Sequence, residues 1–133
     1  LSLRLPGQIA PFETESVVSD GMIVVVGSAN NKCALPFIAS PDDSLLGVIY
    51  RPDGSSAAIG DTVDVVLSGI YPVIAAGPVR TRDLITSGGT DGTAIAESAS
   101  AGTNVGVLGQ AIEDGVSGDR VATIINPFIK QGG

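Results

Sequence analysis

The residues that could do chemistry in this 133-residue chain are mainly carboxylates, because it contains fourteen Asp and Glu but no His. Paired carboxylates could serve acid–base catalysis or bind a metal ion. Most of the Asp residues stand beside Gly, Pro or Ser, where an Asp side chain caps a turn by accepting backbone N–H groups. No window has the spacing of an EF-hand loop. We therefore expect turn-forming carboxylates, no metal site and no cofactor. The residues concerned are Asp42, Asp43, Asp53, Asp61, Asp64, Asp91, Asp114 and Asp119.

Nucleophilic catalysis is disfavoured by the same composition. A serine such as Ser44 or Ser87 would need a base, and the sequence has no His and no Ser-x-x-Lys pattern. Gly102, Gly106 and Gly109 lack the spacing of a dinucleotide-binding loop. We expect that the protein is not an enzyme.

The net charge of the chain limits the kinds of molecule that it could bind. Seven basic and fourteen acidic residues give a formal net charge of −7, which repels a phosphate backbone. Nucleic acid is therefore not an expected partner. Positive charge concentrates locally in Arg80-Thr81-Arg82-Asp83. This segment is a solvated turn or forms an intrachain ion pair, or else its guanidinium groups pair with carboxylates of a neighbouring subunit.

Membrane insertion and thiol chemistry are also disfavoured. No apolar run approaches the roughly 18 residues that would cross a bilayer, so we expect no membrane partner. Cys33 is the single cysteine and is followed by Ala34 and Leu35. These apolar neighbours predict a buried, unreactive thiol.

Short apolar runs separated by Gly, Pro, Asp and Asn predict strands and turns throughout most of the chain. Thr62 to Leu67 alternates apolar and polar positions, as a strand with one buried face does. No segment keeps a helical apolar stripe over three turns, so we expect almost no helix. Strands are predicted near residues 22–26, 33–38, 45–50, 62–67, 70–75, 83–87, 93–98, 105–112 and 120–125.

Part of this pattern occurs twice. Leu46-Gly47 matches Leu108-Gly109, 62 residues later, and Gly60-Asp61 matches Gly118-Asp119, 58 residues later. Two related halves packed together would bury each other's apolar faces. Chance similarity between β segments is the alternative. Further pairs at the offset of 62 are Ile23 with Ile85, Gly27 with Gly89 and Ala34 with Ala96.

These patterns predict an all-β protein, a compact antiparallel β-sandwich or barrel that is jelly-roll-like, with about nine short strands from two related halves. We expect one β domain over residues 20–127 and a short C-terminal tail over 128–133. Residues 1–19 are expected to form an extended N-terminal arm, because Pro6 and Pro11 disfavour helix. The arm is either a frayed terminus or, given its many apolar side chains, a segment that docks on a partner.

Several short motifs recur in a characteristic order between about residue 20 and residue 127. They are Asp20-Gly21-Met22-Ile23-Val24, Leu46-Gly47-Val48, Ala58-Ile59-Gly60-Asp61-Thr62-Val63, Leu67-Ser68-Gly69, Asp83-Leu84-Ile85-Thr86-Ser87, Gly92-Thr93-Ala94, Val107-Leu108-Gly109-Gln110-Ala111 and Gly118-Asp119-Arg120-Val121. In order and spacing they resemble the small head decoration, or capsid cement, proteins of tailed bacteriophages.

The resemblance implies a structural virion protein that binds the outside of an icosahedral head, after assembly in the host cytoplasm. It implies that the protein cements neighbouring major-capsid-protein subunits and forms a homo-dimer or homo-trimer. A β-rich binding module of a tail fibre or cell-surface adhesin is the alternative. The candidate contacts with the shell or with neighbouring subunits are Leu1, Leu3, Arg4, Leu5, Ile9, Phe12, Arg80 and Arg82.

Overall fold

The computed structural model describes residues 4–36, 45–88, 91–97 and 105–130. Within these residues all regular secondary structure is β and there is no helix, which confirms the predicted fold class. Consequently, these residues include no helix that is long and apolar enough to cross a membrane.

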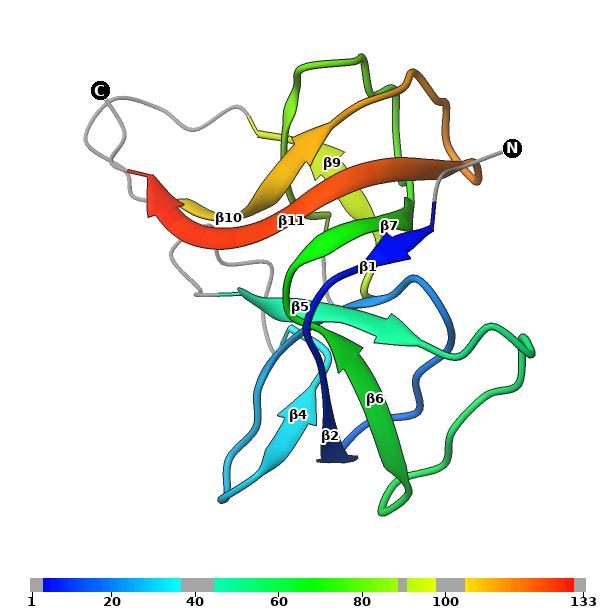
Figure 1. The fold of residues 1–133 in the computed structure, drawn as a ribbon, viewed down its shortest axis with the longest axis vertical. Helices are drawn as coiled ribbons and strands as arrows, with labels where there is room; N and C mark the ends of the chain where they lie inside the picture. The colour runs from blue at the N-terminus through cyan, green and yellow to red at the C-terminus, as the bar shows by residue number, and fades with distance from the viewer. Residues whose placement is uncertain (1–3, 37–44, 89–90, 98–104, 131–133) are drawn as a thin grey trace.

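Eleven strands form two sheets, one above the other in Figure 1. The nine strands predicted from the apolar runs are all present, as β3 to β11, and two more lie in the expected arm. Residues 37, 38 and 98, which belong to two of the predicted strands, lie outside the described residues. The strands are β1 (Leu5–Pro6), β2 (Ile9–Thr14), β3 (Ile23–Val26), β4 (Lys32–Ala34), β5 (Leu45–Tyr50), β6 (Thr62–Val66), β7 (Gly69–Ile74), β8 (Leu84–Ser87), β9 (Ala94–Ala96), β10 (Val105–Ala111) and β11 (Arg120–Lys130).

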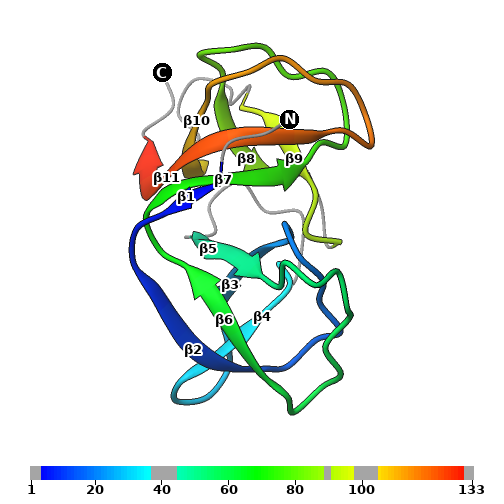
Figure 2. The same ribbon diagram turned by 45° about the vertical axis from the view of Figure 1, so that its right-hand side comes forward.

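Five strands close into a small barrel in the order β2-β4-β3-β5-β6, the lower body in Figures 1 and 2. β2 pairs antiparallel with β6, whereas Thr14 pairs with Cys33 of β4 in a parallel register. This parallel pair departs from the antiparallel prediction, and it is the contact that closes the barrel. Small and β-branched side chains fill the interior, as the narrow space of a five-stranded barrel requires. They are Val18, Val24, Cys33, Ile49, Ala57, Val63 and Val65.

The other sheet has six strands in the order β1-β7-β11-β10-β8-β9. Its strands β7, β11, β10, β8 and β9 repeat the barrel strands β2, β6, β5, β3 and β4 in the same neighbour relations. Among the described residues, β9 has no strand pairing with β7, but a parallel bridge joins Ala94 of β9 to Ala75, the residue after β7, and is the counterpart of the pair Thr14 and Cys33. The second half is therefore an open form of the barrel made by the first half.

Main-chain hydrogen bonds fix the correspondence between the halves. The Gly21 N–H donates to the Ile49 carbonyl, and the Arg82 N–H donates in the same way to the Ala111 carbonyl. Gly21 and Arg82 are 61 residues apart, whereas Ile49 and Ala111 are 62 apart. The two related halves are thus confirmed, but the uniform offset of 62 was wrong by one residue in β3 and β8 and in β4 and β9, where Ala34 corresponds to Ile95 rather than Ala96.

This one-residue correction changes which side chains correspond. Ile23 pairs with Val48 across β3 and β5, and Leu84 pairs with Gln110 across β8 and β10. The counterpart of Ile23 is therefore Leu84 rather than Ile85. Successive side chains of a strand point to opposite faces of the sheet. The one-residue shift therefore reverses which residues of β8 correspond to the inward-facing residues of β3 and which to the outward-facing ones.

The outside of the barrel covers the inner face of the open sheet. Ile23, Val48 and Val66 point outward from the barrel but are fully buried. They share one core with side chains of the second half, among them Tyr71, Val73, Leu108 and Ile125. β5 is the barrel strand that contacts β10 and β11, and it lies directly beneath the sheet in Figure 2. Each such aliphatic side chain contributes about 1.5–3 kcal/mol when buried, so this contact unites the halves.

The N-terminal residues are extended, but they do not form an arm separate from the β body. Leu5 of β1 pairs with Ile70 of β7, and β2 pairs along its length with β6. Phe12 packs against the barrel core. These strands satisfy edges of β6 and β7 that would otherwise be unpaired.

The expected boundaries at both ends therefore change. Phe128 to Lys130 continue β11, although we expected a tail from residue 128. Residues 131–133, and the candidate contacts Leu1 and Leu3, lie outside the described residues.

Candidate functional site

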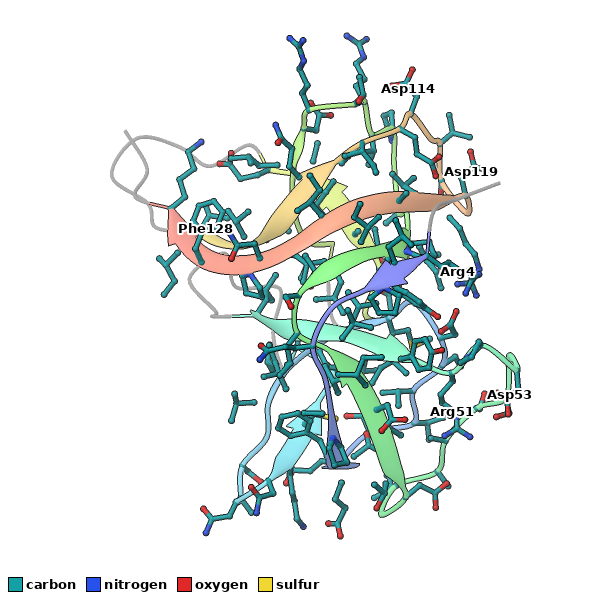
Figure 3. All side chains as sticks on the ribbon, in the orientation of Figure 1. Arg4, Arg51, Asp53, Asp114, Asp119 and Phe128 are labelled. Atoms are coloured by element: carbon teal, nitrogen blue, oxygen red, sulfur yellow. The ribbon has the colours of Figure 1, made fainter. Side chains whose placement is uncertain are left out.

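Most of the carboxylates considered for chemistry form turns, as predicted, but Asp64 lies within strand β6 and pairs with Pro11 and Tyr50. Asp61, Asp83 and Asp119 each accept a hydrogen bond from the backbone N–H three residues earlier, at 2.9, 2.9 and 3.0 Å. Asp114 accepts the N–H of Thr81 at 2.8 Å, and it lies with Asp119 in the connection from β10 to β11 (Figure 3). These side chains hold loops together at both ends of the molecule.

Asp53 and Asp91 cap turns by accepting hydrogen bonds from the residue two positions later. The backbone N–H of Ser55 and its hydroxyl donate to Asp53, which lowers the pKa of that carboxyl group. The hydroxyl and the N–H of Thr93 do the same for Asp91. In the described part of the chain no three His, Cys, Asp or Glu side chains are grouped so that they could hold a metal ion. Asp42 and Asp43 lie outside that part.

Cys33 lies inside the barrel and is fully buried, which confirms the sequence prediction. Burial raises the pKa of its thiol, because the charged thiolate is poorly solvated there. The thiol therefore stays protonated and contributes packing rather than reactivity.

A buried carboxylate that the sequence did not single out lies where the two halves meet. Asp20 is 3% exposed and accepts a hydrogen bond from the Tyr71 hydroxyl at 2.6 Å. The Arg51 N–H donates to it at 2.8 Å, and Arg120 Nη1 donates at 3.0 Å. Asp20 therefore connects the first half, through Arg51, to β7 and β11 of the second half.

Arg4, a candidate contact residue, is engaged at the same place. Its Nη1 lies 3.0 Å from the Tyr71 hydroxyl and 3.5 Å from Asp20, and its guanidinium carbon lies 5.3 Å from the centre of the Tyr71 ring. Figure 3 shows Arg4 just before β1. Its contacts position the edge strand β1, which carries Leu5, on the sheet.

The outer face of the six-stranded sheet carries a set of aligned, mainly apolar side chains, several of which are exposed. Backbone pairing places Leu5, Ile70, Ile124, Gln110 and Leu84 in one row across five strands. Partners in adjacent strands share a face, so these side chains are neighbours. Asn126 and Phe128 line the same shallow groove as Leu84, Gln110 and Ile124. We call this set of seven residues the uncovered face.

The corresponding row in the first half is buried except at Ile9, which is 39% exposed. It runs through Ile9, Val66, Val48 and Ile23, of which the last three form the contact with the open sheet. In the second half no part of the described chain covers the same row: Leu5 is 62% exposed, Ile124 40% and Phe128 43%. The duplication therefore leaves one copy of an interface surface without a partner among the described residues.

Arg80 and Arg82 lie on an exposed turn in the connection from β7 to β8, at the end farthest from the barrel in Figures 1 and 2. The Arg82 carbonyl accepts a hydrogen bond from the Gln110 side chain at 3.0 Å, so the turn borders the uncovered face. Leu5 lies at the opposite edge of that face, on β1. Three of the candidate contacts predicted from the sequence are thus brought to one surface, whereas Ile9 and Phe12 lie on the barrel.

The arrangement defines a duplicated all-β body that presents surfaces for association. Sequence searches find no matching protein-family model and no matching curated protein. Among solved structures, the fold is similar to that of the head fiber gp8.5 N base of bacteriophage phi29. The two chains share 19% identity with a TM-score of 0.56, and the match covers 90% of this chain and 93% of that chain. At this level of identity, the likeness establishes the fold.

The Asp20 contact makes stability depend on pH at the alkaline end. Burial and the hydrogen bond to Asp20 raise the pKa of Tyr71 above its usual value of about 10. The folded state therefore keeps its proton where the unfolded state loses it. Stability from this group is complete below about pH 10 and falls above it by up to about 1.4 kcal/mol per pH unit.

We predict that Tyr71→Phe removes part of this alkaline loss. At pH 8 the variant is less stable than the wild type by about 1 kcal/mol, because the hydrogen bond to Asp20 is lost. Above about pH 10 the difference in free energy of unfolding shrinks. Urea titrations at pH 8 and pH 11 measure it, with Tyr50→Phe as the matched control that keeps the wild-type loss. A difference that stays constant with pH contradicts the assignment.

Proposed function

We propose that this chain is a structural protein of a tailed-phage virion that binds the outside of the icosahedral head. The observation that carries the proposal is the fold match, over nearly the full length of both chains, with the base of a phage head fiber. The order of the short sequence motifs, which resembles head decoration proteins, points the same way independently.

The proposed activity is attachment and cementing rather than catalysis. The chain would bind neighbouring major-capsid-protein subunits and hold them together, as a homo-dimer or homo-trimer. A body whose halves share one core is suited to this role, because a rigid connector transmits force between its contact points. Weak contacts suffice, since repeated sites on a shell raise the effective concentration of each copy. The engagement of Asp53, Asp61, Asp91, Asp114 and Asp119 in turns supports a non-enzymatic role.

A carbohydrate-binding module of a tail fibre or adhesin is the rival proposal. Such a module usually stacks sugars on exposed aromatic rings. Here the Tyr71 ring is fully buried and the Tyr50 ring packs against it, 5.4 Å between centroids. Phe128 is exposed, but it lines its groove together with Leu84 and Ile124 as well as Gln110 and Asn126. The geometry therefore favours a protein partner over a sugar.

We predict that the purified protein co-sediments with heads of its phage that lack it. Binding should saturate at a fixed number of copies per head, because capsomer sites are equivalent by symmetry. Cementing should also raise the temperature at which filled heads release DNA. An unrelated acidic β protein of similar size is the control for non-specific binding. Absence of co-sedimentation at saturating concentration would overturn the proposed function.

A further inference from the structure

We propose that the uncovered face is the interface with a second copy of this chain, and that Arg80 and Arg82 at its rim bind carboxylates of that copy. The inference deepens the homo-oligomer part of the proposed function. It does not depend on attachment to phage heads, so the two can fail separately.

The centre of the face has the chemistry of a protein interface. None of its seven residues is ionisable, although the chain carries a net charge of −7. Leu5, Ile124 and Phe128 are 62%, 40% and 43% exposed, in a row that crosses five strands. Interface centres are depleted in charge and enriched in aromatic and aliphatic contact. Aligned apolar surface of this kind marks an association site.

The same surface is already an interface in the first half. Val66 corresponds to Ile124, Val48 to Gln110 and Ile23 to Leu84, and the three first-half residues are fully buried in the contact between halves. The surface that covers them is the inner face of the open sheet. In any second molecule that inner face is occupied by its own barrel. The uncovered face therefore has to bind a surface other than this inner face. The uncovered face of another copy is such a surface, because it is also apolar and free of charge.

A second copy of this acidic chain can supply the carboxylates that the two arginines would bind. Two molecules of charge −7 repel each other, so a stable contact needs an uncharged centre and local positive charge beside it. The uncovered face provides the uncharged centre, and Arg80 and Arg82 provide the positive charge beside it. The fourteen acidic residues of another copy are a ready source of carboxylates for the two guanidinium groups.

The two arginines have no such partner in the described part of the chain. Arg4, Lys32, Arg120 and Lys130 form ion pairs, and the Arg51 side chain donates to Ser55. Among the described residues, neither the Arg80 nor the Arg82 guanidinium has a recorded hydrogen bond or ion pair. The nearby carboxylates of Asp83 and Asp114 accept backbone N–H groups of Arg80 and Thr81 instead.

The backbone conformation of Arg82 is one that destabilises the fold when the residue is an arginine. The same four-residue turn occurs at 19–22, 58–61, 80–83 and 116–119, each closed by a hydrogen bond from the fourth N–H to the first carbonyl. The third residue has φ of 84°, 95°, 79° and 90° in turn. It is glycine in three turns, at Gly21, Gly60 and Gly118, and arginine in the fourth.

Positive φ is unfavourable for a residue with a Cβ, and such strain concentrates at functional positions. The turn itself requires only the glycine that its three counterparts have. A side chain that destabilises its own turn, projects from the surface and has no recorded partner in the described chain is accounted for by a contact with another molecule.

The first test measures association across the apolar centre. We expect the wild-type protein to sediment as a species larger than the monomer at high micromolar concentration, and Ile124→Lys to sediment as a folded monomer. Ile59→Lys is the matched control, since Ile59 is also exposed but lies on a turn of the barrel; it should associate like the wild type. A monomeric wild type, or association that survives Ile124→Lys, overturns the proposal.

The second test separates strain from binding at Arg82. In the monomeric Ile124→Lys background, Arg82→Gly should raise the folding equilibrium constant about fivefold by relieving strain. In the otherwise wild-type chain it should weaken association by at least about threefold, with a smaller dependence on salt. If Arg82 had only a structural role, its replacement would not make the protein more stable and at the same time weaken association.

Gly118→Arg is the matched control for strain. A Cβ at Gly118 would have no atom within 4 Å, so only the positive φ opposes the substitution. It should lower the folding equilibrium constant about fivefold and leave association unchanged. If Arg82→Gly associates as tightly as the wild type, or fails to stabilise the monomer, the role assigned to Arg82 is wrong.

Discussion

The packing of Ile23, Val48 and Val66 against the open sheet is the contact on which the rest of the structure depends. The first half closes into a barrel with its own interior, whereas the second half closes only at the bridge between Ala75 and Ala94. Its inner face would therefore meet water if the barrel were absent. The two copies of the motif therefore form their cores differently. The first half encloses its own core, whereas the inner face of the second half is covered by the first half.

Most of the fold could be predicted from the sequence, because short apolar runs between turn residues mark strands directly. The strands β1 and β2 were missed because Pro6 and Pro11 indicated an arm. Pro6 lies in the edge strand β1, and Pro11 lies where β2 has β6 as its only paired neighbour. Proline is tolerated at both positions because no ladder hydrogen bond is required on the open side.

The surfaces were harder to predict, for two physical reasons. Asp20 gathers Arg4, Arg51, Tyr71 and Arg120 from separations of 16 to 100 residues, which no local pattern reveals. The strained turn was hidden by register, because an offset of 62 aligns Gly21 with Asp83, whereas the offset of 61 aligns it with Arg82. The uncovered face likewise becomes visible only when each half is compared with the other in the correct register.

The central claim is that one motif surface is core in the first half and exterior in the second. Exchanging the corresponding residues Val48 and Gln110 tests it most directly, through the free energy of unfolding of Val48→Gln and Gln110→Val measured below the association range. The account predicts that Val48→Gln costs on the order of 3 kcal/mol or more, because it buries an amide in apolar surroundings, and that Gln110→Val changes stability by less than about 0.5 kcal/mol. Similar effects of the two substitutions would contradict it.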